Sequence, residues 1–185
     1  FAFSSYSSYL SSSSNDEYEE NAKDFESILD LATAVFPQKM LNWHYRSKSE
    51  SLIAFSNHNF YNDKLVTFPS SHIDNDNFGI KFHYVANGVF VNRVNLQEAN
   101  AVADLVYESL LKYPKMSIGV VCFSISQQSL LEDVIDDRRR KNPVFDKMLL
   151  ENTNEPFFIK NLETVQGDER DIIIFSIGYG KDSSG

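Results

Sequence analysis

The fold of this chain is constrained most by one apolar run, IIIFS at residues 172–176. A short, unbroken run rich in β-branched residues is typical of a strand that is buried on both faces, and such strands occur mainly in parallel sheets. The polar stretch ETVQGDERD at 163–171 comes directly before it. We therefore expect this stretch to form a loop at one edge of a covered sheet, where α/β proteins carry ligands.

Helical and strand-like patterns alternate along the rest of the chain. Between Gln97 and Lys112 apolar residues recur at steps of three and four, as on the buried face of a helix. Ser124 has capping-box spacing to Gln127 and is expected to begin another helix. Further helices are expected at 24–36 and 49–61, a turn at 87–88, and strands at 80–85, 118–123, 156–159 and 171–177. This alternation predicts an α/β fold, with helices on both faces of a mainly parallel sheet.

Composition sets the domain organisation. The 185 residues are 42% hydrophobic, enough for one domain with a substantial core. Residues 1–23 are serine-rich and then acidic without apolar periodicity, so we expect a flexible segment there and a single domain over 24–185. The chain does not begin with Met, and we expect it to be a piece of a larger protein.

Several classes of protein do not fit this sequence. No apolar stretch approaches the roughly 18 residues that span a bilayer, and the start lacks the pattern of a signal peptide. We expect a cytoplasmic protein that does not contact a membrane. The single cysteine, Cys122, lies inside an apolar strand pattern, which favours a buried small hydrophobic side chain over a metal ligand.

Three ordered segments carry a resemblance to a known family. They are LNWHYRS at 41–47, before a predicted helix that ends in Phe-Tyr; SIGVVCFS at 117–124, before a helix that carries Gln127; and ETVQGDERD at 163–171. Together they resemble segments of superfamily 1 helicases, in the branch that contains the RNA helicase of nonsense-mediated decay. The second is similar to motif IV of that branch, and the third to motif V.

This resemblance implies a fold and a function. The fold would be a three-layer RecA-like domain of the P-loop NTPase type, the second motor domain of an ATP-dependent DNA or RNA helicase. The chain has no GxxxxGKS/T loop and no motif VI, so the first RecA-like domain would lie elsewhere in the parent protein. The parent would use ATP and Mg²⁺ and move along single-stranded DNA or RNA. The fragment alone would bind neither ATP nor Mg²⁺ and would be inactive.

The nucleotide-binding residues follow from the first and third segments. The resemblance implies that Arg46 is an arginine finger, because a guanidinium can stabilise the charge that develops as the terminal phosphate of ATP departs. A surface arginine paired with Glu50 at helical spacing is the structural alternative. Tyr45 would stack on a base or ribose, or else pack in the core.

The third segment contributes a glycine and two polar side chains. Gly167 allows the backbone to approach a phosphate, Gln166 can donate to the same group, and Glu169 corresponds to the acid that accepts from the ribose hydroxyl in related motors. A simple polar turn before a buried strand is the structural alternative.

The nucleic-acid-binding residues implied by the resemblance are Ser124, Ser126, Gln127 and Thr164. Many relatives have Thr-Pro-Tyr where this chain has Phe-Ser-Ile-Ser, and capping the next helix is an adequate role for Ser124. We assign no metal ligands. In the basic run at 138–141, Arg140 and Lys141 have the acids Asp136 and Asp137 four residues before them, so the run is expected to form a solvated helix end.

The net charge of −9 opposes tight nucleic-acid binding by this chain alone, because phosphate binding usually draws on a basic surface. Helicase motors bind the strand between two domains, so one of them need not be basic by itself. The alternative function is a non-catalytic α/β module of helicase-like fold that acts as a protein-interaction domain through its acidic surface.

Overall fold

The computed structural model describes residues 27–47, 49–68, 79–151 and 155–182. The predicted flexible segment 1–23 lies outside the described residues, as do Asp24 and Phe25 at the start of the first predicted helix. The chain divides into two compact units, Phe1–Lys81 and Phe82–Gly185, and each is described by itself.

The described residues of the first unit form two helices and a parallel strand pair. Ser27 caps the first helix, because its hydroxyl accepts from the backbone N–H of Asp30 at 3.1 Å, and the helix ends before Pro37. The predicted helix over 49–61 is also present. The described elements of this unit are α2 (Ile28–Val35), β1 (Trp43–His44), α3 (Ser51–Phe60) and β2 (Val66–Thr67), with β1 parallel to β2.

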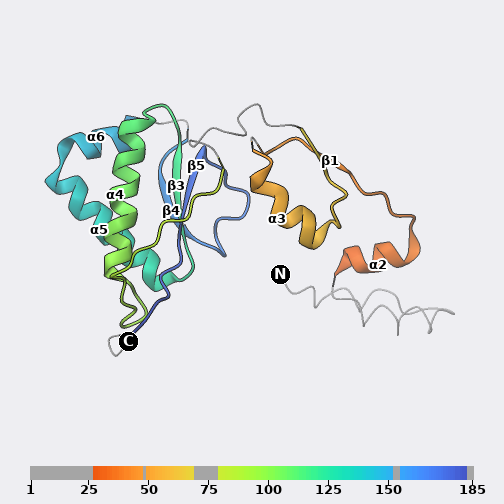
Figure 1. The fold of residues 1–185 in the computed structure, drawn as a ribbon, viewed down its shortest axis with the longest axis horizontal. Coiled ribbons are helices and arrows are strands. Elements are labelled where there is room, and N and C mark those ends of the chain that lie inside the picture. The colour runs from red at the N-terminus through yellow and green to blue at the C-terminus, as the bar shows by residue number, and fades with distance from the viewer. Residues whose placement is uncertain (1–26, 48, 69–78, 152–154, 183–185) are drawn as a thin grey trace, which may run out of the picture. The chain divides into compact units, whose positions relative to one another are not determined.

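The second unit is a three-stranded sheet with three helices (Figure 1). The strands lie in the order β4-β3-β5, and both pairings are parallel. The elements are α4 (Leu96–Lys112), β3 (Ile118–Cys122), α5 (Ile125–Lys141), α6 (Pro143–Glu151), β4 (Phe158–Asn161) and β5 (Ile172–Ser176). The predicted α/β class with a mainly parallel sheet is confirmed.

The core lies between one face of this sheet and the helices. Side chains alternate between the two faces of a strand, so Ile118, Val120 and Cys122 of the central strand share one face. They pack against the apolar stripe of α4 that the sequence predicts and against buried residues of α5 and α6. The buried cluster consists of Ala99, Val102, Ala103, Val106, Leu110, Ile118, Val120, Cys122, Leu131, Ile135, Phe145 and Leu149.

Within the described part of the second unit, helices lie on one face of the sheet, whereas helices on both faces were predicted. Figure 1 shows α4, α5 and α6 together on one side of the strands. The connection from β4 to β5, residues 162–171, has to pass the central strand β3. Its contacts with Phe158 and Lys160, which point away from the core, place it on the opposite face. A helical crossover usually needs a dozen residues or more, so this short connection crosses as a loop.

A second prediction was wrong. Residues 80–85 are described and form no strand, although their pattern alternates; Ile80, Phe82 and Tyr84 are exposed. An alternating pattern produces a strand only where a neighbouring strand supplies hydrogen bonds. None of the described strands pairs with residues 80–85. The predicted turn that follows is confirmed, because the backbone N–H of Gly88 donates to the carbonyl of Val85 at 3.0 Å.

None of the helices in the described ranges combines the length and the apolar character needed to cross a bilayer.

Candidate functional site

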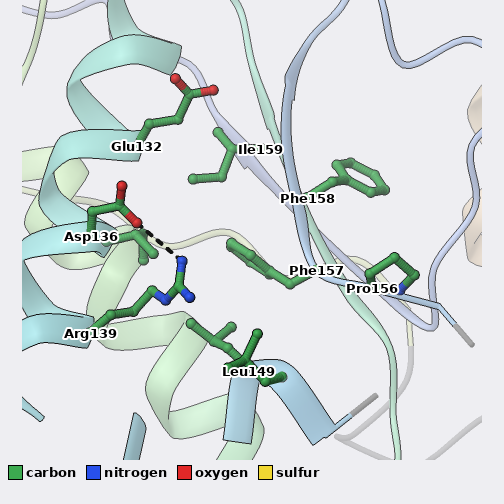
Figure 2. A pocket seen from close by; sticks show the side chains of 10 residues that line it. Glu132, Asp136, Arg139, Leu149, Pro156, Phe157, Phe158 and Ile159 are labelled. Carbon is green, nitrogen blue, oxygen red and sulfur yellow. Dashed lines mark hydrogen bonds and ion pairs between the residues drawn. The ribbon is translucent and has the colours of Figure 1, made fainter. Parts of the chain in front are cut away.

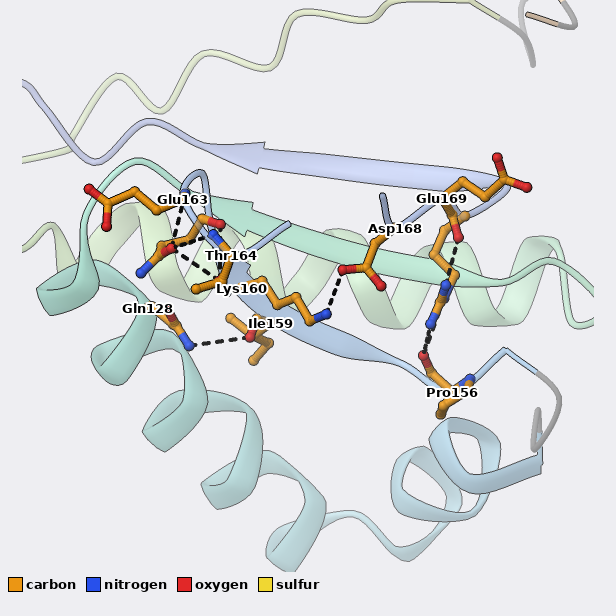
Figure 3. Close-up of polar contacts among 10 residues, drawn as sticks. Gln128, Pro156, Ile159, Lys160, Glu163, Thr164, Asp168 and Glu169 are labelled. Atoms are coloured by element: carbon orange, nitrogen blue, oxygen red, sulfur yellow. Dashed lines mark hydrogen bonds and ion pairs between the residues drawn. The ribbon is translucent and has the colours of Figure 1, made fainter. Parts of the chain in front are cut away.

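The loop at 162–171 follows Asn161, whose side chain organises the first turn of the loop, at Glu163 and Thr164 (Figure 3). Asn161 ends β4 and is 8% exposed. Its side-chain oxygen accepts from the backbone N–H groups of Glu163 and Thr164, at 3.1 and 3.0 Å, and from the Thr164 hydroxyl at 3.1 Å. An Asn side chain that bonds the backbone two residues ahead is a common way to start a turn. The exposed Thr164 is therefore held in one orientation.

A tight turn follows at the predicted glycine. The backbone N–H of Asp168 donates to the carbonyl of Val165 at 3.0 Å, and Gly167 has a φ of +90°. A positive φ at the third position is typical of a type II turn and favours glycine. A Cβ added to Gly167 would meet nothing within 4 Å, and Gln166 is exposed beside it. The backbone of this turn is therefore open to a ligand.

The second half of the loop is tied to the sheet at three positions. Asp168 forms an ion pair with Lys160 on β4, and Arg170 donates twice to the carbonyl of Pro156, at 2.8 and 3.2 Å. The Asp171 carboxylate accepts from the backbone N–H and the hydroxyl of Ser117, each at 3.1 Å. Glu169 is exposed between these anchors. Asp168 and Asp171 are thus structural, and the side chains left pointing outward are those of the turn.

Three of the predicted strand-binding residues lie near the carboxyl edge of the sheet. Ser124 follows β3, and Thr164 follows the neighbouring parallel strand β4. The ends of these two strands are joined by a hydrogen bond of 3.1 Å from the N–H of Leu162 to the carbonyl of Cys122. Ser124 caps α5 as predicted, accepting from the N–H of Gln127 at 3.2 Å. Ser126 is half-buried in the first turn of the same helix.

The fourth predicted residue, Gln127, is placed differently. It is 1% exposed, and its side-chain oxygen accepts from the backbone N–H of Asn95 at 2.8 Å. Its amide nitrogen donates to the Asn95 carbonyl at 3.2 Å and to the Ser176 hydroxyl at 3.3 Å. The amide is fully engaged in joining the starts of α4 and α5 to the end of β5. This burial corrects the assignment of Gln127 to the bound strand, because a buried amide cannot reach a ligand.

The same buried network continues into the segment after β5. The Ser176 hydroxyl donates to Glu98 at 2.7 Å, and the backbone N–H of Gly178 donates to the same carboxylate oxygen at 2.8 Å. Gly178 has a φ of +78° and lies against the Gln127 side chain. Sequence reasoning gave no role to Glu98 or Ser176, since residues so far apart in sequence show no local pattern.

The first unit carries Tyr45 and Arg46. Both follow β1 directly, in the turn before α3, and both are exposed; the Tyr45 side chain is 82% exposed. The turn is shaped by His44, whose Nε2 lies 2.7 Å from the Ser47 hydroxyl and accepts from the Ser47 N–H at 3.2 Å. Glu50, the alternative partner for Arg46, accepts from the Thr67 hydroxyl at 2.9 Å. Tyr45 thus shows no core packing among the described residues of this unit.

Two further ionisable features, Cys122 and the basic run at 138–141, interact with other parts of the fold. Cys122 is fully buried, which confirms the predicted buried side chain. This burial, with smaller contributions from the negative charges of Glu132 and Glu98, raises the pKa of the Cys122 thiol to about 12. The basic run at the end of α5 is paired with nearby acids, as predicted for a helix end. The pairs are Arg138–Asp104, Arg139–Asp136, Arg139–Asp146 and Lys141–Asp137.

A surface pocket of about 340 Å³ lies elsewhere, between α5, α6 and β4 (Figure 2). Its walls include the apolar side chains of Leu149, Phe157 and Ile159, and the Asp136–Arg139 ion pair lies at its side. None of the predicted site residues lines it. Within the described ranges, no three His, Cys, Asp or Glu side chains gather as a metal ion would need.

Similarity to known proteins shows the family of this chain. A family model described as an AAA domain matches residues 21–183, nearly the whole chain. The chain belongs to this AAA domain family. This AAA domain is also 40% identical over 148 residues to a protein of Mycoplasma pneumoniae, and 39% identical over 147 residues to one of Mycoplasma genitalium. Both relatives are named as uncharacterized ATP-dependent helicases.

The match covers 77% of this chain but 13% of each relative. The AAA domain described here therefore spans about an eighth of the length of these relatives, and the rest of their length has no counterpart in this chain.

Proposed function

We propose that this AAA domain is the second RecA-like motor domain of an ATP-dependent superfamily 1 helicase, in the branch of the nonsense-mediated-decay helicase. The names of the two relatives and the order of the three segments support the helicase assignment. The observation that carries the proposal is the loop at 162–171, whose anchors leave an open glycine turn exposed beside Glu169.

Arg46 is the proposed arginine finger. It is exposed at the carboxyl end of a parallel strand, in the turn before a helix. In the full-length protein it would reach the terminal phosphate of ATP held with Mg²⁺ by the first motor domain, where it would stabilise developing negative charge. Tyr45 beside it offers a flat exposed face for stacking on the nucleotide.

The open turn is the second proposed contact with that nucleotide. The backbone at Gly167 can approach a phosphate or ribose because no neighbouring atom occupies the space where a side chain would begin. The Gln166 amide can donate to an oxygen, and the Glu169 carboxylate can accept from a ribose hydroxyl. These three residues and Arg46 would respond to ATP only when the first motor domain is present.

The proposed strand contacts are the hydroxyl groups at the carboxyl edge of the sheet. Ser124 accepts a capping bond but keeps its own O–H to donate, and Ser126 lies in the first turn of the same helix. Thr164 meets them at the same edge; its O–H donates to Asn161, so it would donate to a phosphate only in place of that bond. Such hydroxyls contact backbone phosphates without reading sequence, which suits a motor on single-stranded DNA or RNA. Gln127 is left out of this set because its amide is buried.

The experiment that tests the proposal is Arg46→Ala in the full-length protein. We expect strand-stimulated ATP hydrolysis to fall by about 10³-fold or more, since an arginine finger contributes about that much to phosphoryl transfer. Arg140→Ala is the matched control, because Arg140 is exposed and its side chain donates to the carbonyl of Asp136 on its own helix. Unchanged turnover in Arg46→Ala, with both variants folded, would exclude the finger.

The net charge of −9 favours a second candidate, a non-catalytic protein-interaction module with a helicase-like fold. The coding sequence around this segment separates the two. A GxxxxGKS/T loop upstream and an arginine motif downstream would support the motor, whereas a P-loop without its lysine would support the interaction module.

A further inference from the structure

An aromatic ring lies flat on the sheet under the loop at 162–171. Phe158 of β4 is paired in register with Gly119 of β3, on the face away from the helices. A Cβ added to Gly119 would lie 2.4 Å from Cζ of that ring and 2.8 Å from two further ring carbons. The ring therefore occupies the space that any other residue at 119 would fill. Glycine at this position lets the ring cover the central strand.

Two cationic side chains rest on this ring. The ammonium of Lys160 lies 5.3 Å from the ring centroid, and the guanidinium carbon of Arg170 lies 4.8 Å from it. Both distances are within the range of cation–π attraction, which holds a charged group over an aromatic face. One cation comes from β4 and the other from the end of the loop, so the ring joins two separate segments.

Each cation also holds the loop. Lys160 pairs with Asp168, which directly follows the Gly167 turn, and the two side chains are only 35% and 27% exposed. Arg170 donates to the Pro156 carbonyl through two nitrogens and to the Glu169 carbonyl at 2.6 Å through the third. The contacts therefore lie on both sides of the exposed Glu169.

We propose that Lys160 and Arg170, seated on Phe158, are positioning residues for the ligand-binding turn. They touch no ligand; they hold the Gly167 turn and Glu169 in one conformation before a ligand arrives. A glycine-containing turn that is ordered in advance loses less conformational entropy on binding, and the affinity for its ligand rises accordingly. This inference rests on the proposed function for the identity of the ligand, but the ordering of the loop can be measured without it.

The first measurement is hydrogen exchange in the full-length protein, on peptides covering 162–171. The amides of Val165 and Asp168 are bonded to the carbonyls of Asn161 and Val165 and report on the turn. In Lys160→Met we expect these amides to exchange about fivefold faster, with unchanged exchange in α4. Lys160→Arg should restore most of the protection, because arginine keeps the positive charge and is also attracted to an aromatic face.

Lys141→Met is the matched control. It makes the same chemical change and also breaks a pair with an aspartate, Asp137, but this pair lies at the end of α5. We expect no change in exchange at 162–171. Equal exchange in Lys160→Met and the wild type would overturn the proposal. Faster exchange in the Lys141→Met control would overturn it too, because the effect would then not be specific to the pair under the loop.

The second measurement separates this inference from the proposed function. In Lys160→Met we expect the KM for ATP to rise about tenfold while kcat stays within twofold, because positioning acts on binding and not on the chemical step. A lower kcat at unchanged KM would count against positioning. If the wild-type full-length protein has no strand-stimulated ATPase, the proposed function fails, and the exchange experiment still decides whether Lys160 orders the loop.

Discussion

Gln127 shows how burial decides what a polar side chain can do. Its position after a motif IV-like strand suggested contact with a bound strand, but its amide makes three hydrogen bonds inside the protein. A buried polar group is costly unless it is bonded, so such a side chain is held in place by its partners. The hydrogen bonds of Gln127 therefore stabilise the folded second unit.

Gln127→Leu should destabilise the second unit by about 3 kcal/mol, because it leaves the N–H and carbonyl of Asn95 buried without these partners. Urea unfolding of the chain, followed by circular dichroism, measures the change. Ser129→Ala is the control: Ser129 is exposed on the same helix, and we expect a change below about 0.5 kcal/mol. A loss equal to that of the control would contradict the structural role.

Cys122 provides a second residue-scale prediction, on pH. Its pKa is raised from 9.0 to about 12, so between these values the unfolded chain holds a thiolate while the folded chain holds a thiol. The unfolded state then binds fewer protons, and the stability contributed by Cys122 falls as pH rises from 9 towards 12. We expect the free energy of unfolding to fall more steeply with pH in the wild type than in Cys122→Ala. Parallel curves would contradict the raised pKa.

At the scale of elements, the pairing of β3 with β4 depends on one glycine. The Phe158 ring covers Gly119, and the loop between β4 and β5 is anchored above the same pair of strands. The contact between the Phe158 ring and Gly119 therefore couples the strands to the loop, and any side chain at position 119 would disturb it.

Gly119→Ala should destabilise the second unit by about 1–3 kcal/mol, because the added methyl forces the ring to move. Adding Phe158→Leu should recover part of this loss, since the smaller side chain leaves room. Gly167→Ala is the comparison: it costs about 1–2 kcal/mol through its positive φ, and Phe158→Leu should not relieve it. Urea unfolding of the three single variants and of the two double variants that contain Phe158→Leu forms the test, and additive losses for Gly119→Ala and Phe158→Leu would contradict the contact.

At the scale of the whole molecule, net charge sets how the chain meets nucleic acid. The concentrated basic run on α5 is paired with acids, and the sequence carries a net charge of −9. A polyanion gains little by approaching such a surface, because few counterions are released from its phosphates.

We therefore expect this chain alone to bind a single-stranded oligonucleotide at least about 100-fold more weakly than the full-length protein does. Fluorescence anisotropy with a labelled strand, at two salt concentrations, measures both affinities and their salt dependence. Tight, salt-sensitive binding by the isolated chain would show that this domain carries the strand-binding surface by itself.

Much of the fold was predictable because it depends on neighbours close in sequence. The period of α4, the apolar run of β5 and the capping serine before α5 each act within a few residues, and each element is found where it was predicted. The prediction that 172–176 is buried on both faces was wrong: β5 lies at the edge of the described sheet, and Phe175 is 58% exposed. The wrong strand at 80–85 shows the limit of this reasoning, since a strand also needs a partner. For the site, the sequence indicated the glycine turn but gave no signal for Lys160. Its ion pair with Asp168 forms only when the loop crosses the sheet.

What the sequence determined by itself is thus the class of fold and the positions of the elements whose signals are local. The tertiary structure alone decided which polar side chains are buried and which are exposed. The strand order β4-β3-β5 sends the loop at 162–171 across the central strand, and this crossing brings Asp168 to Lys160 and Asp171 to Ser117. Such contacts join residues far apart in the chain, and no local pattern records them because they exist only once the strands have paired.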